Sequence, residues 1–137
     1  MASPERTARV IHGALLFATL LVGTVVMVVG VRVLPVLTET LPRTLLRTVV
    51  IVMALFGTVA LRVVRATLDA PTQPDERASW WTANTGRLVA LWAVSEGVGI
   101  AGVVLAVVAR DMVVAVLVLG WAVFMLLMHA PGRVVEA

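Results

Sequence analysis

Four long runs of apolar residues constrain this chain more than any other feature. They cover residues 10–31, 48–61, 88–109 and 112–130, and most of the polar residues fall outside them. About 20 apolar residues are enough to cross the hydrocarbon core of a bilayer. Only 14% of the residues are charged, whereas soluble domains usually carry about 25%. The sequence therefore predicts an all-α membrane protein.

The charges beside these runs set the expected helix boundaries. The second run is too short to span alone, but Arg47, Arg62 and Arg65 can extend their side chains to the membrane surface and lengthen it. We predict one integral membrane domain over residues 1–137, a four-helix bundle whose transmembrane helices cover residues 10–31, 45–68, 88–109 and 112–130.

Arg110 and Asp111 alone separate the third run from the fourth. One continuous helix through both runs would measure roughly 64 Å, about twice the hydrocarbon thickness. The chain is therefore expected to turn at these two residues and to form a tight antiparallel hairpin. Symmetric pairing about the turn places Glu96 level with Met125 and close to Phe124.

Residues 69–87 contain two prolines, a charged cluster and a tryptophan pair. We interpret this segment as a polar cytoplasmic loop, with Trp80 and Trp81 at headgroup level and Thr85 as the N-cap of the third helix. Seven of the eleven arginines lie at the termini or near this loop. The positive-inside rule then predicts a multi-pass protein of a bacterial-type inner membrane, with both termini in the cytoplasm.

Glu96 is the one charged residue inside the third run. Along a helix it lies about 13 Å from Arg87 and about 21 Å from Arg110. An ionised carboxylate at that depth costs at least about 2.5–3.5 kcal/mol. We therefore expect Glu96 to face protein and to be largely neutral at pH 7, and we name it as the candidate ion- or proton-binding residue.

Small residues follow one face of the same helix. Ser95, Gly99, Gly102 and Ala106 recur at spacings of four, three and four, which lets a neighbouring membrane helix approach closely. We predict that Gly99, Gly102 and Ala106 pack against another helix. The polar or aromatic residues expected to support the Glu96 carboxyl group are Thr19, Thr58, Ser95, Trp92 and Phe124.

The segment "EGVGIAGVVLA", residues 96–106, resembles the ion-binding helix of the proteolipid subunits that form rotary-ATPase rings. Those helices commonly read Glu-x-x-Gly-Ile-x-Gly-x-Val-x-Ala. The matching positions are Glu96, Gly99, Ile100, Gly102, Val104 and Ala106. The resemblance implies that Glu96 takes up and releases a proton or a sodium ion.

No other residues form a recognisable chemical site. The two histidines, His12 and His129, are isolated, and the chain has no cysteine. We predict no metal site, no cofactor and no catalytic residue. Nucleic acid is not expected as a partner, because the net charge is only +3 and the arginines are scattered. The expected partners are the lipid bilayer and either further copies of the chain or a larger membrane complex.

Two functions from different classes stay open. In the first, the chain is a structural or accessory subunit that packs through its small-residue face, and Glu96 is a neutral hydrogen-bonding residue between helices. In the second, Glu96 carries a proton or cation across the membrane. Hydroxyl partners inside the bundle favour the first function, whereas an outward-facing carboxyl group implies an oligomer or another partner protein.

Overall fold

A computed structural model describes residues 3–33, 42–68, 70–71 and 73–135. These residues are largely helical and include no strand, so the predicted all-α class is confirmed for them. The long helices are α1 (Pro4–Val33), α2 (Arg43–Ala66), α3 (Arg77–Val108) and α4 (Met112–Met128). A 3₁₀ turn, η2 (Pro74–Glu76), precedes α3, and a short helix, α5 (Pro131–Val135), follows α4.

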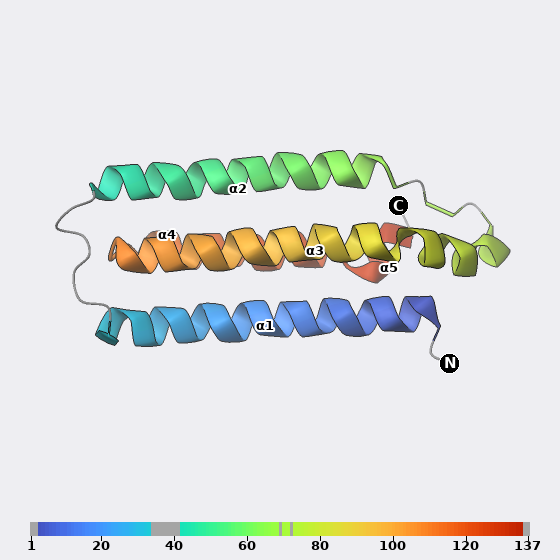
Figure 1. Ribbon diagram of the computed structural model, residues 1–137, viewed down its shortest axis with the longest axis horizontal. Coiled ribbons are helices and arrows are strands. Elements are labelled where there is room, and N and C mark those ends of the chain that lie inside the picture. Colours follow the sequence, from blue (N-terminus) through green and yellow to red (C-terminus); the bar gives the residue numbers. More distant parts are fainter. Residues whose placement is uncertain (1–2, 34–41, 69, 72, 136–137) are drawn as a thin grey trace.

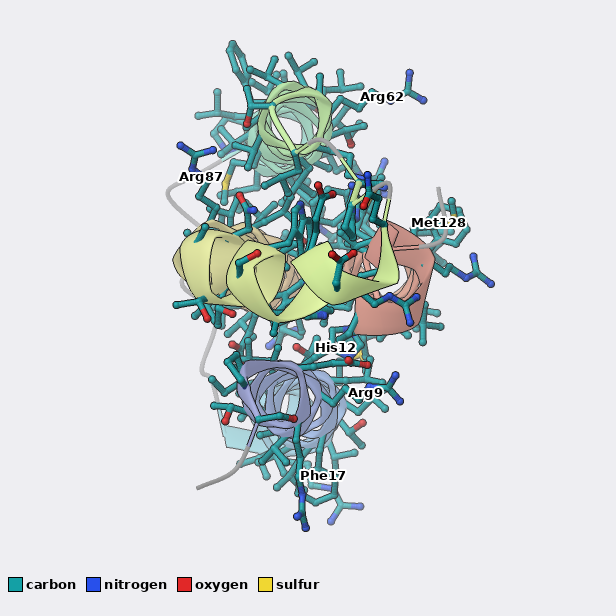
Figure 2. All side chains as sticks on the ribbon, turned by 90° about the vertical axis from the view of Figure 1, so that its right-hand side faces the viewer. Arg9, His12, Phe17, Arg62, Arg87 and Met128 are labelled. Carbon is teal, nitrogen blue, oxygen red and sulfur yellow. The ribbon has the colours of Figure 1, made fainter. Side chains whose placement is uncertain are left out.

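The long helices form three layers rather than a square bundle. α3 and α4 lie side by side in the middle layer, with α1 on one face of this pair and α2 on the opposite face (Figure 2). α1 and α3 run in the same direction, and α2 and α4 run in the other (Figure 1). Since the middle layer separates α1 from α2, each of these helices leaves an apolar outer face uncovered, as the exposure of Phe17 and Phe56 shows.

Three of these helices, α1, α2 and α3, are long and apolar enough to cross a membrane, by length and composition. The fourth is shorter than predicted. α4 has 17 residues, or about 25 Å at 1.5 Å per residue, against about 30 Å for the hydrocarbon core. It ends at Met128, close before Pro131, which has no N–H to donate to the helix.

The prediction of a polar loop over residues 69–87 is wrong for most of its length. α3 begins at Arg77, about three turns before the predicted start. Thr85 is not an N-cap: it lies inside α3, where its hydroxyl donates to the Trp81 carbonyl. Residues 77–85 are polar but include neither proline nor glycine, so nothing in them opposes a helix. Residues 69 and 72 lie outside the described part of the chain.

Trp81 is enclosed by protein instead of lying among lipid headgroups. Its side chain is 1% exposed and packs with Leu68, Leu88 and Val134. Trp80 is half-buried, and the two rings meet edge-on with centroids 5.1 Å apart. The N-terminal turns of α3 therefore form a core together with the ends of α2 and α5.

The predicted hairpin of α3 and α4 is present, and small residues bring the two helices together. A Cβ atom added to Gly99 would lie 2.3 Å from the Cβ of Ala122, and one added to Gly102 would lie 2.5 Å from Cγ1 of Val118. Gly99, Gly102 and Ala106, the residues predicted to pack against another helix, are all buried. This face is occupied within the chain, so it is not free to join protomers.

Candidate functional site

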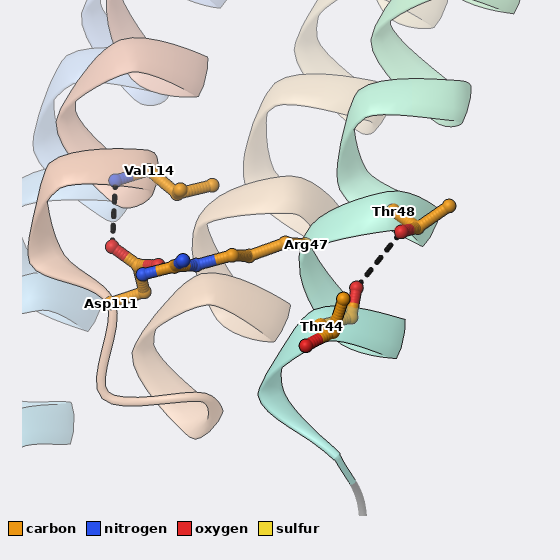
Figure 3. A network of polar contacts seen from close by, with 5 residues as sticks. All are labelled: Thr44, Arg47, Thr48, Asp111 and Val114. Atoms are coloured by element: carbon orange, nitrogen blue, oxygen red, sulfur yellow. Dashed lines mark hydrogen bonds and ion pairs between the residues drawn. The ribbon is translucent and has the colours of Figure 1, made fainter.

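The turn between α3 and α4 depends on two adjacent residues. Arg110 has a φ of 54°, in the left-handed region that few residues other than glycine adopt. Asp111 then caps α4, because its carboxylate accepts a hydrogen bond from the Val114 N–H at 3.2 Å. The same carboxylate also binds Arg47 of α2 (Figure 3). The turn is thereby attached to a helix in another layer.

Asp111 is charged at neutral pH despite its burial. Asp111 is 8% exposed, whereas the side chain of Arg47 is 56% exposed. Burial acts to raise the pKa of Asp111, but the hydrogen bonds from Arg47 and Val114 outweigh it. The nearby positive charges of Arg47 and Arg43 act in the same direction, so the pKa of Asp111 lies below its ordinary value. Sequence reasoning missed this pair, because Arg47 is 64 positions away.

The other end of α4 lies against α1 and α3, and its last carbonyl groups need donors. Pro131 has no N–H, and the N–H of Ala130 donates to Leu127 at 3.3 Å. This leaves the carbonyl of Leu126 without its helical donor. His12 of α1 bonds that oxygen through Nε2 at 2.8 Å. A carbonyl oxygen only accepts, so Nε2 carries the proton.

Trp92 of α3 completes this arrangement. Its indole N–H donates to the His129 carbonyl at 2.8 Å, and its ring meets the His12 ring edge-on with centroids 5.0 Å apart. The His129 ring in turn bonds the Met125 carbonyl through Nδ1 at 2.7 Å. We call His12, Trp92 and His129 the α4 cap. The α4 cap joins α1 and α3 to the C-terminal end of α4. The sequence feature that indicates it is Pro131, two residues after His129.

Glu96 lies at the edge of the packed face of α3. Its side chain is half-buried, and it forms no hydrogen bond or ion pair with any residue that the structure describes. Among its neighbours on α3, Trp92 and Gly99 are buried whereas Ala93 and Gly97 are exposed. The carboxyl group therefore stands between the protein interior and the outer surface, without the partners that a hydrogen-bonding role between helices requires.

The five residues predicted to support Glu96 have other contacts. The hydroxyls of Thr19, Thr58 and Ser95 each donate to the carbonyl four residues earlier in their own helix. Thr58 also accepts a hydrogen bond from Trp121 at 3.0 Å, so it joins α2 to α4. Trp92 belongs to the α4 cap, and Phe124 is 55% exposed. The structure does not assemble a polar pocket around Glu96.

A second row of small residues lies on the outer face of α3. Gly86, Ala90, Ala93 and Gly97 are all exposed and recur at spacings of four, three and four. A Cβ atom on Gly86 or Gly97 would meet nothing within 4 Å. We call these four residues the outer row, and Glu96 borders it. Its spacing in the sequence equals that of the buried face, so only the fold distinguishes the two.

No family model, curated protein or solved structure matches this chain. The likeness of residues 96–106 to proteolipid helices therefore stays a prediction from the sequence. Among the described residues, no group of three or more histidine and acidic side chains is placed to hold a metal ion. The candidate site consequently consists of Glu96 and the outer row beside it.

Proposed function

We propose that this chain is a structural or accessory subunit of a membrane assembly, and that it docks another membrane helix along the outer row of α3. The observation that supports this function is the exposure of four small residues at helix-packing spacing. Small side chains let two helix backbones approach closely in lipid, where van der Waals contact and interhelical hydrogen bonds supply the stability.

The remaining outer surface has a different character. Large apolar side chains cover α1 and α2, including Phe17, Leu21, Leu55 and Phe56, all more than half exposed. Such side chains suit contact with lipid tails. The outer row instead offers a shallow strip of backbone, which lipid fills poorly and a second helix fills well. The contrast favours a protein partner on this side of α3.

Glu96 would gain its missing partner from the docked helix. An intramembrane carboxyl group without a hydrogen bond is costly, and a hydroxyl, amide or basic group on the partner would satisfy it. If the partner is a second copy of this chain, two-fold symmetry places both Glu96 side chains at the same interface. Two carboxyl groups so placed would share a proton rather than both ionise.

Site-specific crosslinking tests this function. The chain has no cysteine, so one can be introduced at Ala93 in the outer row and, as a matched control, at Val116, which is exposed on α4. A photoactivatable reagent attached to the cysteine of the Ala93→Cys variant should give a discrete protein adduct in native membranes. Mass spectrometry would identify the partner. Equal labelling from both positions, or lipid adducts alone, would contradict docking on the outer row.

A glycine pair provides the second measurement. Gly97→Ile should remove the Ala93 adduct while the chain keeps its stability, because a side chain at Gly97 has free space within the protomer. Gly120→Ile on α4 is the control, since Gly120 is also exposed and equally open. The adduct at position 93 should persist in the Gly120→Ile variant.

A second candidate function is a proton or cation carrier that uses Glu96, and the unpartnered, half-buried state of this side chain favours it. Glu96→Gln separates the two functions. A carrier would lose pH-driven ion movement in proteoliposomes and reactivity toward a carbodiimide. A docking subunit would show no such ion movement with either residue, and the Ala93 adduct would form with both.

A further inference from the structure

A groove made of two neighbouring cavities runs along the seam between α2 and α4. Two cavities of about 500 and 330 Å³ line up along this seam, and Thr58 contributes to both. Trp121 of α4 keeps the helices apart: its ring contacts the α2 backbone at Gly57, and its N–H bonds the Thr58 hydroxyl. The groove is open along one side, so it communicates with the surroundings of the bundle.

One end of the groove is strongly basic. Arg62 and Arg65 of α2 and Arg133 of α5 line it together with His129. None of the three arginines forms an ion pair with a residue that the structure describes. The described residues that line this cavity include no Asp or Glu. This end, which we call the arginine end, therefore presents three positive charges without a counter-charge among the residues that the structure describes.

Arg65 carries the most specific sign of a missing ligand. Its Nη2 donates to the Val134 carbonyl at 3.2 Å, which fixes the guanidinium group. Its Nη1 is buried and has no hydrogen-bond partner among the described residues. A charged donor shielded from water without an acceptor is costly. A guanidinium group in this state is matched best by the paired oxygens of a phosphate or carboxylate.

The other end of the groove is apolar. Ile51, Leu55, Leu117 and Val118 line it, and Thr58 and Trp121, which bond each other, are its polar members. From Arg65 to Ile51, α2 extends about 21 Å, which exceeds half of the roughly 30 Å hydrocarbon core. An elongated apolar tail from one leaflet fits this length.

We propose that the groove binds an anionic phospholipid, with its phosphate at the arginine end and one acyl chain along the apolar end between α2 and α4. A small soluble anion would use only the charges, and a neutral lipid would use only the apolar part. A basic cavity that adjoins an apolar one on the same helix pair selects a ligand with both features. The site does not depend on the outer row: Arg62 and Met128 lie on one side of the molecule, and Arg87, next to Gly86, lies on the other (Figure 2).

Lipid binding to the purified full chain tests this proposal. The protein is placed in a neutral detergent, phosphatidylglycerol or phosphatidylcholine is added, and native mass spectrometry counts the lipids retained. Phosphatidylglycerol should bind at least about tenfold more tightly, and binding should weaken as salt rises, since Arg–phosphate contact is electrostatic. Equal retention of the two lipids would overturn the proposal.

Matched arginine variants locate the site. Arg65→Gln and Arg133→Gln should each reduce phosphatidylglycerol binding about tenfold, whereas Arg87→Gln removes an equal charge on the other side and should leave it unchanged. An equal loss in all three would mean that the lipid responds to net charge alone, and the site would be wrong. Arg133→Gln also guards against misfolding of Arg65→Gln, because Arg133 is exposed and bonds only the Met128 sulfur.

Two further measurements test the phosphate contact and the acyl-chain contact of the lipid separately. Inorganic phosphate at millimolar concentration should not displace the lipid, since it cannot occupy the apolar end. Leu117→Trp should weaken retention of phosphatidylglycerol by adding bulk to that end, and Val113→Trp on the same helix, 70% exposed and outside the lining, should not. Full displacement by phosphate, or no effect of Leu117→Trp, would show an ion site without a lipid tail.

Discussion

At the N-terminal end of α4, the carboxylate of Asp111 accepts from a free N–H and binds Arg47. At the C-terminal end, the rings of His12 and Trp92 donate to free carbonyls. Both arrangements satisfy groups that a helix terminus leaves unpaired. The first does so with opposite charges, whereas the second does so with ring N–H groups.

The two ends of α4 also differ in the charged groups around them. At the turn, the buried Asp111 has its counter-charge in Arg47. At the arginine end, three arginines stand near the C-terminus of α4 without an acidic partner in the described part of the chain. The helix dipole favours a negative group at the first end and positive groups at the second. Among the described residues, both charged partners are present at the turn, whereas only the positive partner is present at the arginine end.

Removing the acid at the completed end should have the largest effect. Asp111→Ala removes the cap of α4 and the ion pair together, so the free energy of unfolding in mixed micelles should fall by about 2–3 kcal/mol. Thr48→Ala is the control, because the exposed Thr48 hydroxyl only bonds the Thr44 carbonyl in its own helix (Figure 3). A similar loss in both variants would contradict a special role for the turn.

The α4 cap should give a smaller effect. His12→Phe keeps a ring beside Trp92 but leaves the Leu126 carbonyl without a donor, which should lower the free energy of unfolding by about 1–2 kcal/mol. His12→Gln offers a side-chain N–H and should recover part of this loss. If the phenylalanine variant is as stable as the parent chain, the bond to Leu126 contributes nothing.

The contribution of Asp111 to stability should depend on pH. Because the folded pKa of Asp111 lies below its ordinary value, its charge stabilises the fold fully above the unfolded pKa of about 3.9. That contribution is lost as pH falls through the lowered folded pKa. The stability difference between the parent chain and Asp111→Asn should therefore stay constant from pH 8 to about pH 5 and shrink below about pH 4. A difference that stays constant through pH 3, or that grows as pH falls, would mean that the pKa is not lowered.

Much of this fold follows from the sequence. The apolar runs predicted four long helices, and the charged pair at Arg110 and Asp111 predicted the turn. Symmetric pairing about that turn also predicted the register, since it places Gly99 opposite Ala122, where the structure has them in contact. These features depend on residues close in the chain or on simple geometry.

Other features depend on long-range contacts and were missed. The early start of α3 is one, because Trp81 is stabilised there by Leu68 and Val134 from other elements. The three-layer order is another, since apolar periodicity does not determine which helices share a face. The candidate site shows the same limit. Its small-residue spacing occurs twice on α3, and the row predicted to pack against a partner is the one that the chain itself covers.

The smallest expected effect compares the two arginines that face the ends of α4. Arg65→Gln loses one 3.2 Å bond to Val134 and relieves the unpartnered Nη1, so in lipid-free neutral detergent the free energy of unfolding should change by less than about 0.5 kcal/mol. Arg47→Gln should cost more, because it leaves the buried Asp111 carboxylate without its charged partner. Chemical unfolding of the two variants side by side measures the difference. If Arg65→Gln destabilises the lipid-free protein as much as Arg47→Gln does, the arginine end is already complete without a ligand, and the contrast between the two ends is wrong.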